Sequence, residues 1–359
     1  MASSCSSASS SSLNITLSTT ILLILFFAIL PANGECDQSK YGEGCHDRSK
    51  AMKLKIIAIS SILITSMVGV CLPLFSRAVP ALQPDRDLFV VVKAFASGVI
   101  LATGYMHVLP DSFDDLRSEC LPEDPWHKFP FTTFIAMLAA IFTLMVDSFS
   151  ISFFNKKIAN SSAVEASDHN GTNQVKELQQ FGHGHGHGHG HVQCQDSRQL
   201  LRYRVVAQVL EAGILVHSMV IGLSMGASDN PCTIRPLIAA LCFHQFFEGM
   251  GLGGSILQAE YGLKVKAIMA FFFSSTTPFG IALGIGLSKV YSDSSPTSLI
   301  VEGVLNAVSA GLLNYMALVD LLAAEFMGPK LQKNLKLQGL SYIAVLLGAG
   351  GMALMAKWA

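Results

Sequence analysis

Two similar stretches of six residues carry the side chains best suited to metal chemistry in this sequence. They read His217-Ser-Met-Val-Ile-Gly222 and His244-Gln-Phe-Phe-Glu-Gly249, and both lie within otherwise apolar segments. His244 and Glu248 are four residues apart, so on a helix they share one face and can converge on one cation. Ionisable groups are costly at membrane depth and usually face a bundle interior, where they bind ions or substrates. We therefore predict that the two stretches supply metal ligands.

The first stretch differs from the second at its fifth position, where Ile221 replaces a carboxylate. Glu211, six residues before His217, could supply the missing charge along the same route, or it could pair with an arginine. A histidine that only forms a hydrogen bond across a bundle is the ordinary alternative for one intramembrane imidazole. Two matching stretches favour ligands over that alternative.

Further polar residues suggest a route to this site. His107 and Asp111 lie on either side of Pro110 near the outer end of an apolar segment, and Asp147 lies in another. They predict an acidic entrance, although a hydrogen bond between helices is an equal alternative for Asp147. A His-Gly tract also offers five imidazoles on a flexible backbone, which predicts loose metal binding, or else only a solvated linker. Its histidines are His183, His185, His187, His189 and His191.

The composition requires these residues to lie in a membrane protein. The 359 residues are 51% hydrophobic and only 14% charged, with a mean hydropathy of +0.47, which is too apolar for an ordinary soluble domain. The formal net charge of -1 is unlike the basic surface of a nucleic-acid-binding protein. We expect an integral membrane protein with no nucleic-acid partner and the lipid bilayer as its surroundings.

Apolar runs of about 20 residues predict eight membrane-spanning helices. All are expected to be helical, because backbone amides cannot stay unpaired in hydrocarbon and no segment alternates like a barrel strand. Residues 1–34 resemble a signal peptide, with an uncleaved anchor as the alternative, and 35–53 form a short exported segment in which Cys36 and Cys45 could pair. The predicted spans are 54–76, 88–109, 131–154, 203–227, 234–258, 266–288, 299–324 and 338–358.

The long connection 155–202 is polar and carries the His-Gly tract, so we expect a disordered loop. It separates a segment of three spans, 54–154, from the two spans at 203–258 and the three at 266–359. Lys and Arg are concentrated in the loops that would face the cytosol if both termini are outside. Lys50, Lys53 and Lys55, before the first span, run against this orientation.

These motifs resemble those of the ZIP (Zrt/Irt-like) family of divalent metal transporters, in its plant-type branch. The resemblance rests on eight spans, the His-rich loop and the two stretches His217-Ser-Met-Val-Ile-Gly-Leu-Ser-Met-Gly226 and His244-Gln-Phe-Phe-Glu-Gly-Met-Gly-Leu-Gly253. It implies an all-α fold with spans in a 3+2+3 arrangement and a metal held between spans four and five. By position, it implies a transport site of His217, Ser218, His244, Gln245 and Glu248. Ile221 departs from members with a bridging glutamate, so we expect one main transported ion.

The same resemblance implies a plasma-membrane importer that moves a metal into the cytosol by alternating access, with no catalytic cofactor. Imidazole with few carboxylates suits zinc, with ferrous iron as the nearest competitor and manganese, copper and cadmium after it. Whether the chain forms a homodimer is a question that the sequence leaves open. The alternative from another class is an intramembrane zinc-dependent hydrolase using His107, Asp111, His217 and His244. The sequence contains no H-E-x-x-H protease motif, which favours the transporter.

Overall fold

The computed structural model describes residues 47–75, 86–168, 189–287 and 296–356. The predicted signal peptide, Cys36, Cys45 and the first three histidines of the His-Gly tract lie outside these ranges. Helix α5 (Phe131–Asp168) continues beyond its predicted end, and α6 (His189–Ala227) begins within the segment predicted to be a loop. Residues 155–168 contain no proline or glycine, so nothing in their sequence stops the helix where its apolar part ends.

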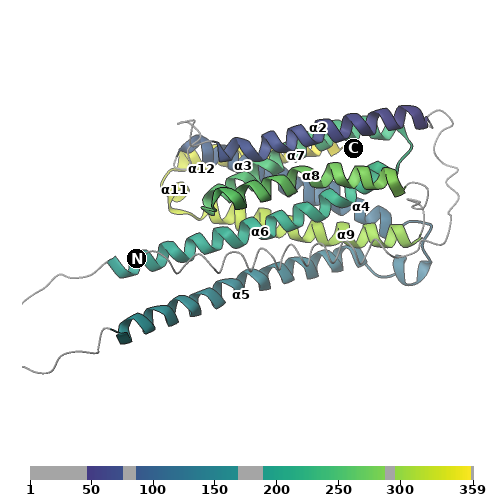
Figure 1. Cartoon of the computed structure of the whole chain (residues 1–359). Helices are drawn as coiled ribbons and strands as arrows, with labels where there is room; N and C mark the ends of the chain where they lie inside the picture. The colour runs from purple at the N-terminus through teal and green to yellow at the C-terminus, as the bar shows by residue number, and fades with distance from the viewer. Residues whose placement is uncertain (1–46, 76–85, 169–188, 288–295, 357–359) are drawn as a thin grey trace, which may run out of the picture.

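The described residues form long helices, as expected for an all-α membrane protein (Figure 1). Seven helical segments among them are long and apolar enough to cross a membrane, and each overlaps a predicted span. The span predicted at 234–258 coincides with α7 (Pro231–Gln258), whose polar residues and glycines lower its mean hydropathy. The seven apolar segments lie in α2 (Arg48–Leu74), α5, α6, α8 (Leu263–Leu287), α12 (Leu335–Ala356) and two interrupted segments.

Each interrupted segment contains a π-helix. The first runs through α3 (Asp87–Thr103), η3 (Gly104–Val108) and α4 (Leu109–Leu116). The second runs through α9 (Pro296–Tyr315), η5 (Met316–Ala323) and α10 (Ala324–Phe326), and the short α11 (Pro329–Gln332) leads to α12. A π-helix changes which side chains face a neighbouring helix, and such bulges are frequent at functional sites. η3 contains His107 and η5 contains Asp320.

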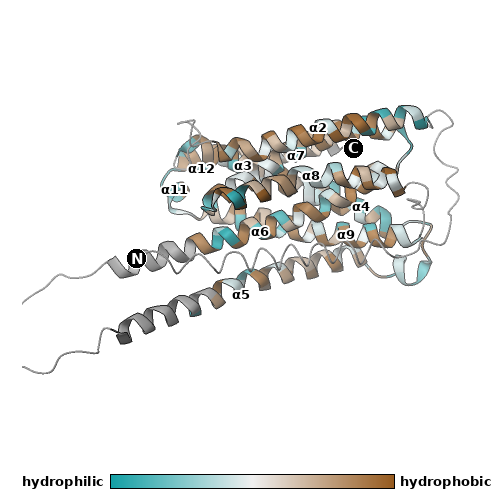
Figure 2. Cartoon of the chain, viewed as in Figure 1, coloured by the Kyte–Doolittle hydropathy of each residue, from teal (hydrophilic) through white to brown (hydrophobic). Residues whose placement is uncertain are grey.

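The long helices pack as two groups. Helices α2, α6, α7 and α8 form the first bundle, in which α2 lies against α7 and α8, and α6 against α8. The second bundle consists of α5, α12 and the two interrupted segments, with α3 against α12 and α5 against α9. Grouping in space therefore differs from the order of three, two and three spans along the chain. Figure 2 shows that hydrophobic residues extend along most of both bundles.

Glycines bring the helices within each bundle into backbone contact. A Cβ atom added to Gly284 of α8 would lie 2.8 Å from the Cα of Gly226 in α6, and still closer to the carbonyl oxygen of Leu223. In the second bundle, a Cβ at Gly98 of α3 would meet the backbone of α12. At Gly251 of α7, by contrast, the neighbour is the side-chain tip of Ile100 in α3. The contacts within bundles are thus rigid, whereas this contact between bundles can adapt.

Candidate metal centre

Three of the predicted ligands come together in the interior of the structure. His217 of α6 and His244 and Glu248 of α7 each offer a ligand atom, and these atoms lie within 4.8 Å of one another. The three side chains are at most 1% exposed. The helical spacing of His244 and Glu248 sets them on one face, and packing of α6 near α7 supplies His217. This cluster is the expected centre of the site.

His107 belongs to the same cluster, although its position in the sequence suggested an entrance residue. The centroid of its ring lies 5.9 Å from that of His217 and 5.8 Å from that of His244, and the latter two rings are 5.8 Å apart. Three imidazoles thus surround one point from three helical segments. His107 reaches this point from η3, in the second bundle, so the centre lies where the two bundles meet.

Most polar side-chain atoms of this cluster have no hydrogen-bond partner within the described part of the chain. Both ring nitrogens of His217 and His244, both carboxylate oxygens of Glu248 and Nε2 of His107 are buried without a hydrogen bond. Leaving such groups unpaired is costly, so their concentration at one point needs an explanation. Imidazole nitrogens with a carboxylate oxygen form a donor set that suits zinc and similar borderline divalent ions. The residues therefore fit a metal ion as cargo.

Ser218 and Gln245 lie beside the two clustered histidines and are equally buried, each 1% exposed. The hydroxyl oxygen of Ser218 and the amide nitrogen of Gln245 also lack hydrogen-bond partners. Successive residues of a helix point about 100° apart, so these side chains diverge from their histidine neighbours. Their part in the transport site stays a prediction.

Asp111 lies next to the centre, one helical turn after His107. Its Oδ2 atom is 3.6 Å from Nδ1 of His107, and its side chain is 42% exposed. Glu302 of α9 is close enough to interact electrostatically with Asp111 and Asp115, and it is 7% exposed. Glu302 was missed in the sequence because it stands alone in an apolar run, with no spacing that relates it to Asp111. Together these carboxyl groups form an acidic approach to His107.

Asp147 and Glu211 lie apart from the three imidazoles. Asp147 of α5 is hydrogen-bonded to Tyr315 and Asp320, which matches the alternative of a bond between helices. Asp320 also lies 3.9 Å from a guanidinium nitrogen of Arg202. Glu211 is buried on α6 and forms no ion pair with an arginine among the described residues. The pairing expected as its alternative role is therefore not found.

The His-Gly tract is described only at its end. His189 and His191 belong to the first turn of α6, whereas His183, His185 and His187 lie outside the described residues. The tract and the buried centre are separate features of the chain, because α6 runs from His189 for 28 residues before it reaches His217. Loose metal binding by the tract stays a prediction.

Comparison with known proteins agrees with the donor set. The family model described as "ZIP Zinc transporter" matches residues 52–356. The chain is 59% identical over 336 residues to "Fe(2+) transport protein 2" of Oryza sativa subsp. japonica, a match that covers 90% of each protein. It is 57% identical over 355 residues to "Zinc transporter 7" of Arabidopsis thaliana, covering 95% of this chain and 97% of that protein.

These matches confirm the transporter over the hydrolase alternative, and they make the metal a substrate rather than a catalytic cofactor. They also confirm the all-α, multi-pass membrane architecture that the apolar helices indicate. The buried cluster of three histidines and a glutamate lies within the matched region. The chain is a divalent-metal transporter and belongs to the ZIP zinc transporter family.

Proposed function

We propose that this chain imports zinc into the cytosol across the plasma membrane, and that His107, His217, His244 and Glu248 hold the ion during transport. The observation that carries this proposal is the closed cluster of unpartnered imidazole and carboxylate atoms at the meeting of the two bundles. Its ligands come from both bundles, so a relative movement of the bundles changes the site. Alternating access follows from that division, with the ion released on the side that opens.

Zinc is the preferred substrate in this proposal because three neutral imidazoles and one carboxylate form a compact, nitrogen-rich set of ligands. Ferrous iron is the main competitor, and relatives of similar identity carry the names of both metals. Ser218, Gln245, Asp111 and Glu302 border the centre and are the groups through which metal preference is expected to be tuned.

The proposed orientation places the N-terminus outside and counts α7, the fifth span along the chain, together with the seven apolar segments to give eight spans. Cys120 and Cys232 are disulfide-bonded. Cys120 lies in the 117–130 connection and Cys232 in the first turn of α7, and this orientation places both in an oxidising compartment. Two cations near the start of α2 form ion pairs with Asp229, which precedes α7. Arg48 and Lys55 lie 2.9 and 3.5 Å from its carboxylate oxygens. Of the three lysines that run against this orientation, Lys55 thus has a carboxylate partner.

The membrane potential can drive this transport without a second ion. Moving one elementary charge across 100 mV is worth about 2.3 kcal/mol, so a dication gains roughly 4–5 kcal/mol on entering a negative cytosol. Lipid is the expected partner of α5, whose apolar segment is only 11% buried and presents Phe142 and Phe149 at 63% and 69% exposure. The same face leaves room for a homodimer.

Uptake of labelled zinc tests the proposal directly. Cells that express the chain are expected to accumulate zinc, with excess ferrous iron as the strongest competitor among iron, manganese, copper and cadmium. Glu248→Ala should abolish uptake at an unchanged surface amount, because the cluster loses its carboxylate. Glu123→Ala, which removes an exposed carboxylate from the 117–130 connection, is the matched control and should leave uptake unchanged. Wild-type uptake by Glu248→Ala would refute the proposed site.

A further inference from the structure

The contact between α3 and α7 is a boundary between the two bundles. Ile100 of α3 faces Gly251 of α7. About one turn further along α7, Gly254 faces the ring of Phe89, which lies near the start of α3. A Cβ atom at Gly254 would lie 3.7 Å from that ring, an ordinary contact distance. At both glycines the atoms nearest to an added Cβ belong to side chains and not to the backbone. This boundary is suited to a movement of α7 along α3.

A buried ammonium group lies at the same boundary. Lys93 of α3 is 6% exposed, and its Nζ atom donates hydrogen bonds to Oε1 of Glu325 at 2.5 Å and to Oε1 of Gln258 at 2.7 Å. The amide nitrogen of Gln258 in turn donates to Glu325 at 3.4 Å. Glu325 belongs to α10, in the second bundle together with Lys93, whereas Gln258 is the last residue of α7 in the first bundle.

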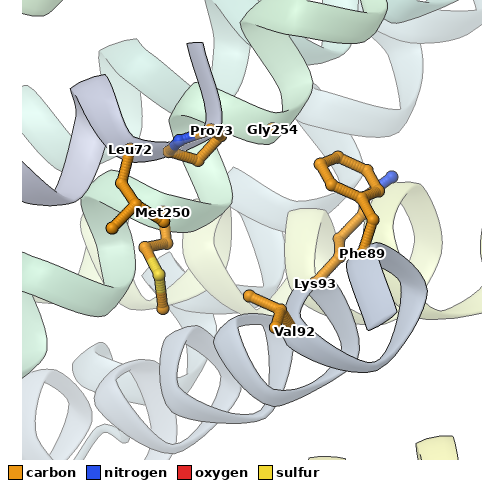
Figure 3. A pocket seen from close by; sticks show the side chains of 7 residues that line it. All are labelled: Leu72, Pro73, Phe89, Val92, Lys93, Met250 and Gly254. Carbon is orange, nitrogen blue, oxygen red and sulfur yellow. The ribbon is translucent and has the colours of Figure 1, made fainter. Parts of the chain in front are cut away.

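An apolar crevice lies beside this network. It is lined from α2 and α7 by Leu72, Pro73, Met250 and Gly254, and from α3 by Phe89, Val92 and Lys93 (Figure 3). Both bundles therefore contribute a wall. Close packing normally fills such boundaries, so space here lets the walls change their separation without a steric clash.

We propose that Lys93, Gln258 and Glu325 form a latch that holds the cytosolic ends of the bundles together while the transport site is closed. The latch rests on the proposed transport function and orientation, and it opens when Gln258 leaves Lys93 so that α7 can move and the ion can depart. The network lies at the end of α7 that this orientation places toward the cytosol, ten residues beyond Glu248.

The distribution of charge makes this latch reversible. The ion pair between Lys93 and Glu325 joins two segments of the same bundle, so it stays intact when the bundles separate. Only the neutral amide of Gln258 crosses the boundary. Breaking a buried ion pair leaves a charge without compensation, which is strongly unfavourable, whereas releasing an amide is a modest change. The hydrogen bonds of one side chain, Gln258, can therefore control the equilibrium between the closed and cytosol-open states.

The test measures access to the crevice without any need for transport. The reporter is Gly254→Cys in the full-length chain, a position where a side chain fits. Inside-out vesicles with a zinc chelator are treated with a maleimide, and labelling at residue 254 is followed by peptide mass spectrometry. Adding Gln258→Leu should raise the labelling rate about tenfold, which corresponds to a closed state less stable by about 1.4 kcal/mol relative to the cytosol-open state. Gln338→Leu, the same change in α12, should leave the rate unchanged.

A second variant covers the case in which Gln258→Leu fails to reach the membrane. Lys93→Met combined with Glu325→Met removes both partners of Gln258 at similar side-chain volume and leaves no unpaired charge, so it should also raise labelling. Gln258→Leu should further raise the external zinc concentration needed for half-maximal uptake at equal surface amount, because fewer molecules face outward. Labelling rates equal to the reporter alone in both variants would overturn the latch. Loss of the proposed function would appear separately, as zinc uptake that does not depend on Glu248.

Discussion

The glycine contact between α6 and α8 leads to a quantitative prediction. Gly284→Ala places a methyl group 2.8 Å from the Cα of Gly226 and against the carbonyl of Leu223, where no flexible side chain can yield. Gly286→Ala is a matched control two residues away on α8, because a Cβ there has no neighbour within 4 Å. Both changes favour the helix by up to about 1 kcal/mol through the better propensity of alanine. They differ only in what the methyl group meets.

The magnitude follows from these contacts. An ordinary Cβ contact begins near 3.4 Å, so α6 and α8 must separate by at least about 0.6 Å to admit the methyl of Gly284→Ala. Overpacking of this kind costs about 1–3 kcal/mol. Because Gly286→Ala shares the gain in helix propensity, Gly284→Ala should have a Tm lower than that control by roughly 2–12 °C, at about 2–4 °C per kcal/mol. Gly286→Ala itself should be neutral or slightly stabilising. Movement of α6 also shifts His217, so zinc uptake should fall with Gly284→Ala.

Thermal unfolding of the full-length chain in detergent, followed by the amount of monodisperse protein after heating, checks this prediction. Zinc uptake at matched surface amounts gives the second readout. Equal Tm values for Gly284→Ala and Gly286→Ala would refute the claim that backbone contact at glycine holds the first bundle together. A lower Tm for both would instead show that α8 tolerates no alanine near its end, for reasons unrelated to Gly226.

Three further predictions follow. His107→Ala should reduce zinc uptake at least about tenfold, because the cluster loses one of three imidazoles. His127→Ala, which changes an exposed histidine in the 117–130 connection, should leave uptake unchanged, and equal uptake by the two variants would remove His107 from the site. Deletion of 183–191 should change regulation or selectivity and spare uptake itself, which competitive uptake checks and which complete loss of transport would contradict. Burial alone would raise the pKa of Asp229, but the hydrogen bond from Arg48 and the nearby cations lower it below its usual 3.8. A lowered pKa stabilises the folded state above pH 3.8 and loses that contribution as pH falls through the folded value, so the Tm gap between wild type and Asp229→Asn should close there.

Much of the architecture could be predicted because its signals are local. Runs of apolar residues indicate spans, and seven of the predicted spans recur as long apolar helices in the described residues. The spacing of His244 and Glu248 places both on one face of α7 whatever the helix packs against. The repeated stretch at His217 indicated a partner on a second helix. These features depend on periodicity and composition within one segment, and the sequence contains both.

Other features depend on contacts between distant segments and on departures from regular helix. His107 enters the cluster from η3, a π-helix, and a regular 3.6-residue pattern does not predict that departure from the α-helix. Lys93 meets Gln258 and Glu325 across separations of 165 and 232 residues, and no local spacing relates them. The sequence by itself therefore determined the membrane class, the apolar helices and the candidate ligands His217, His244 and Glu248. Only the tertiary structure decided which helices form each bundle and which imidazole completes the centre, because both depend on how the helices pack against one another.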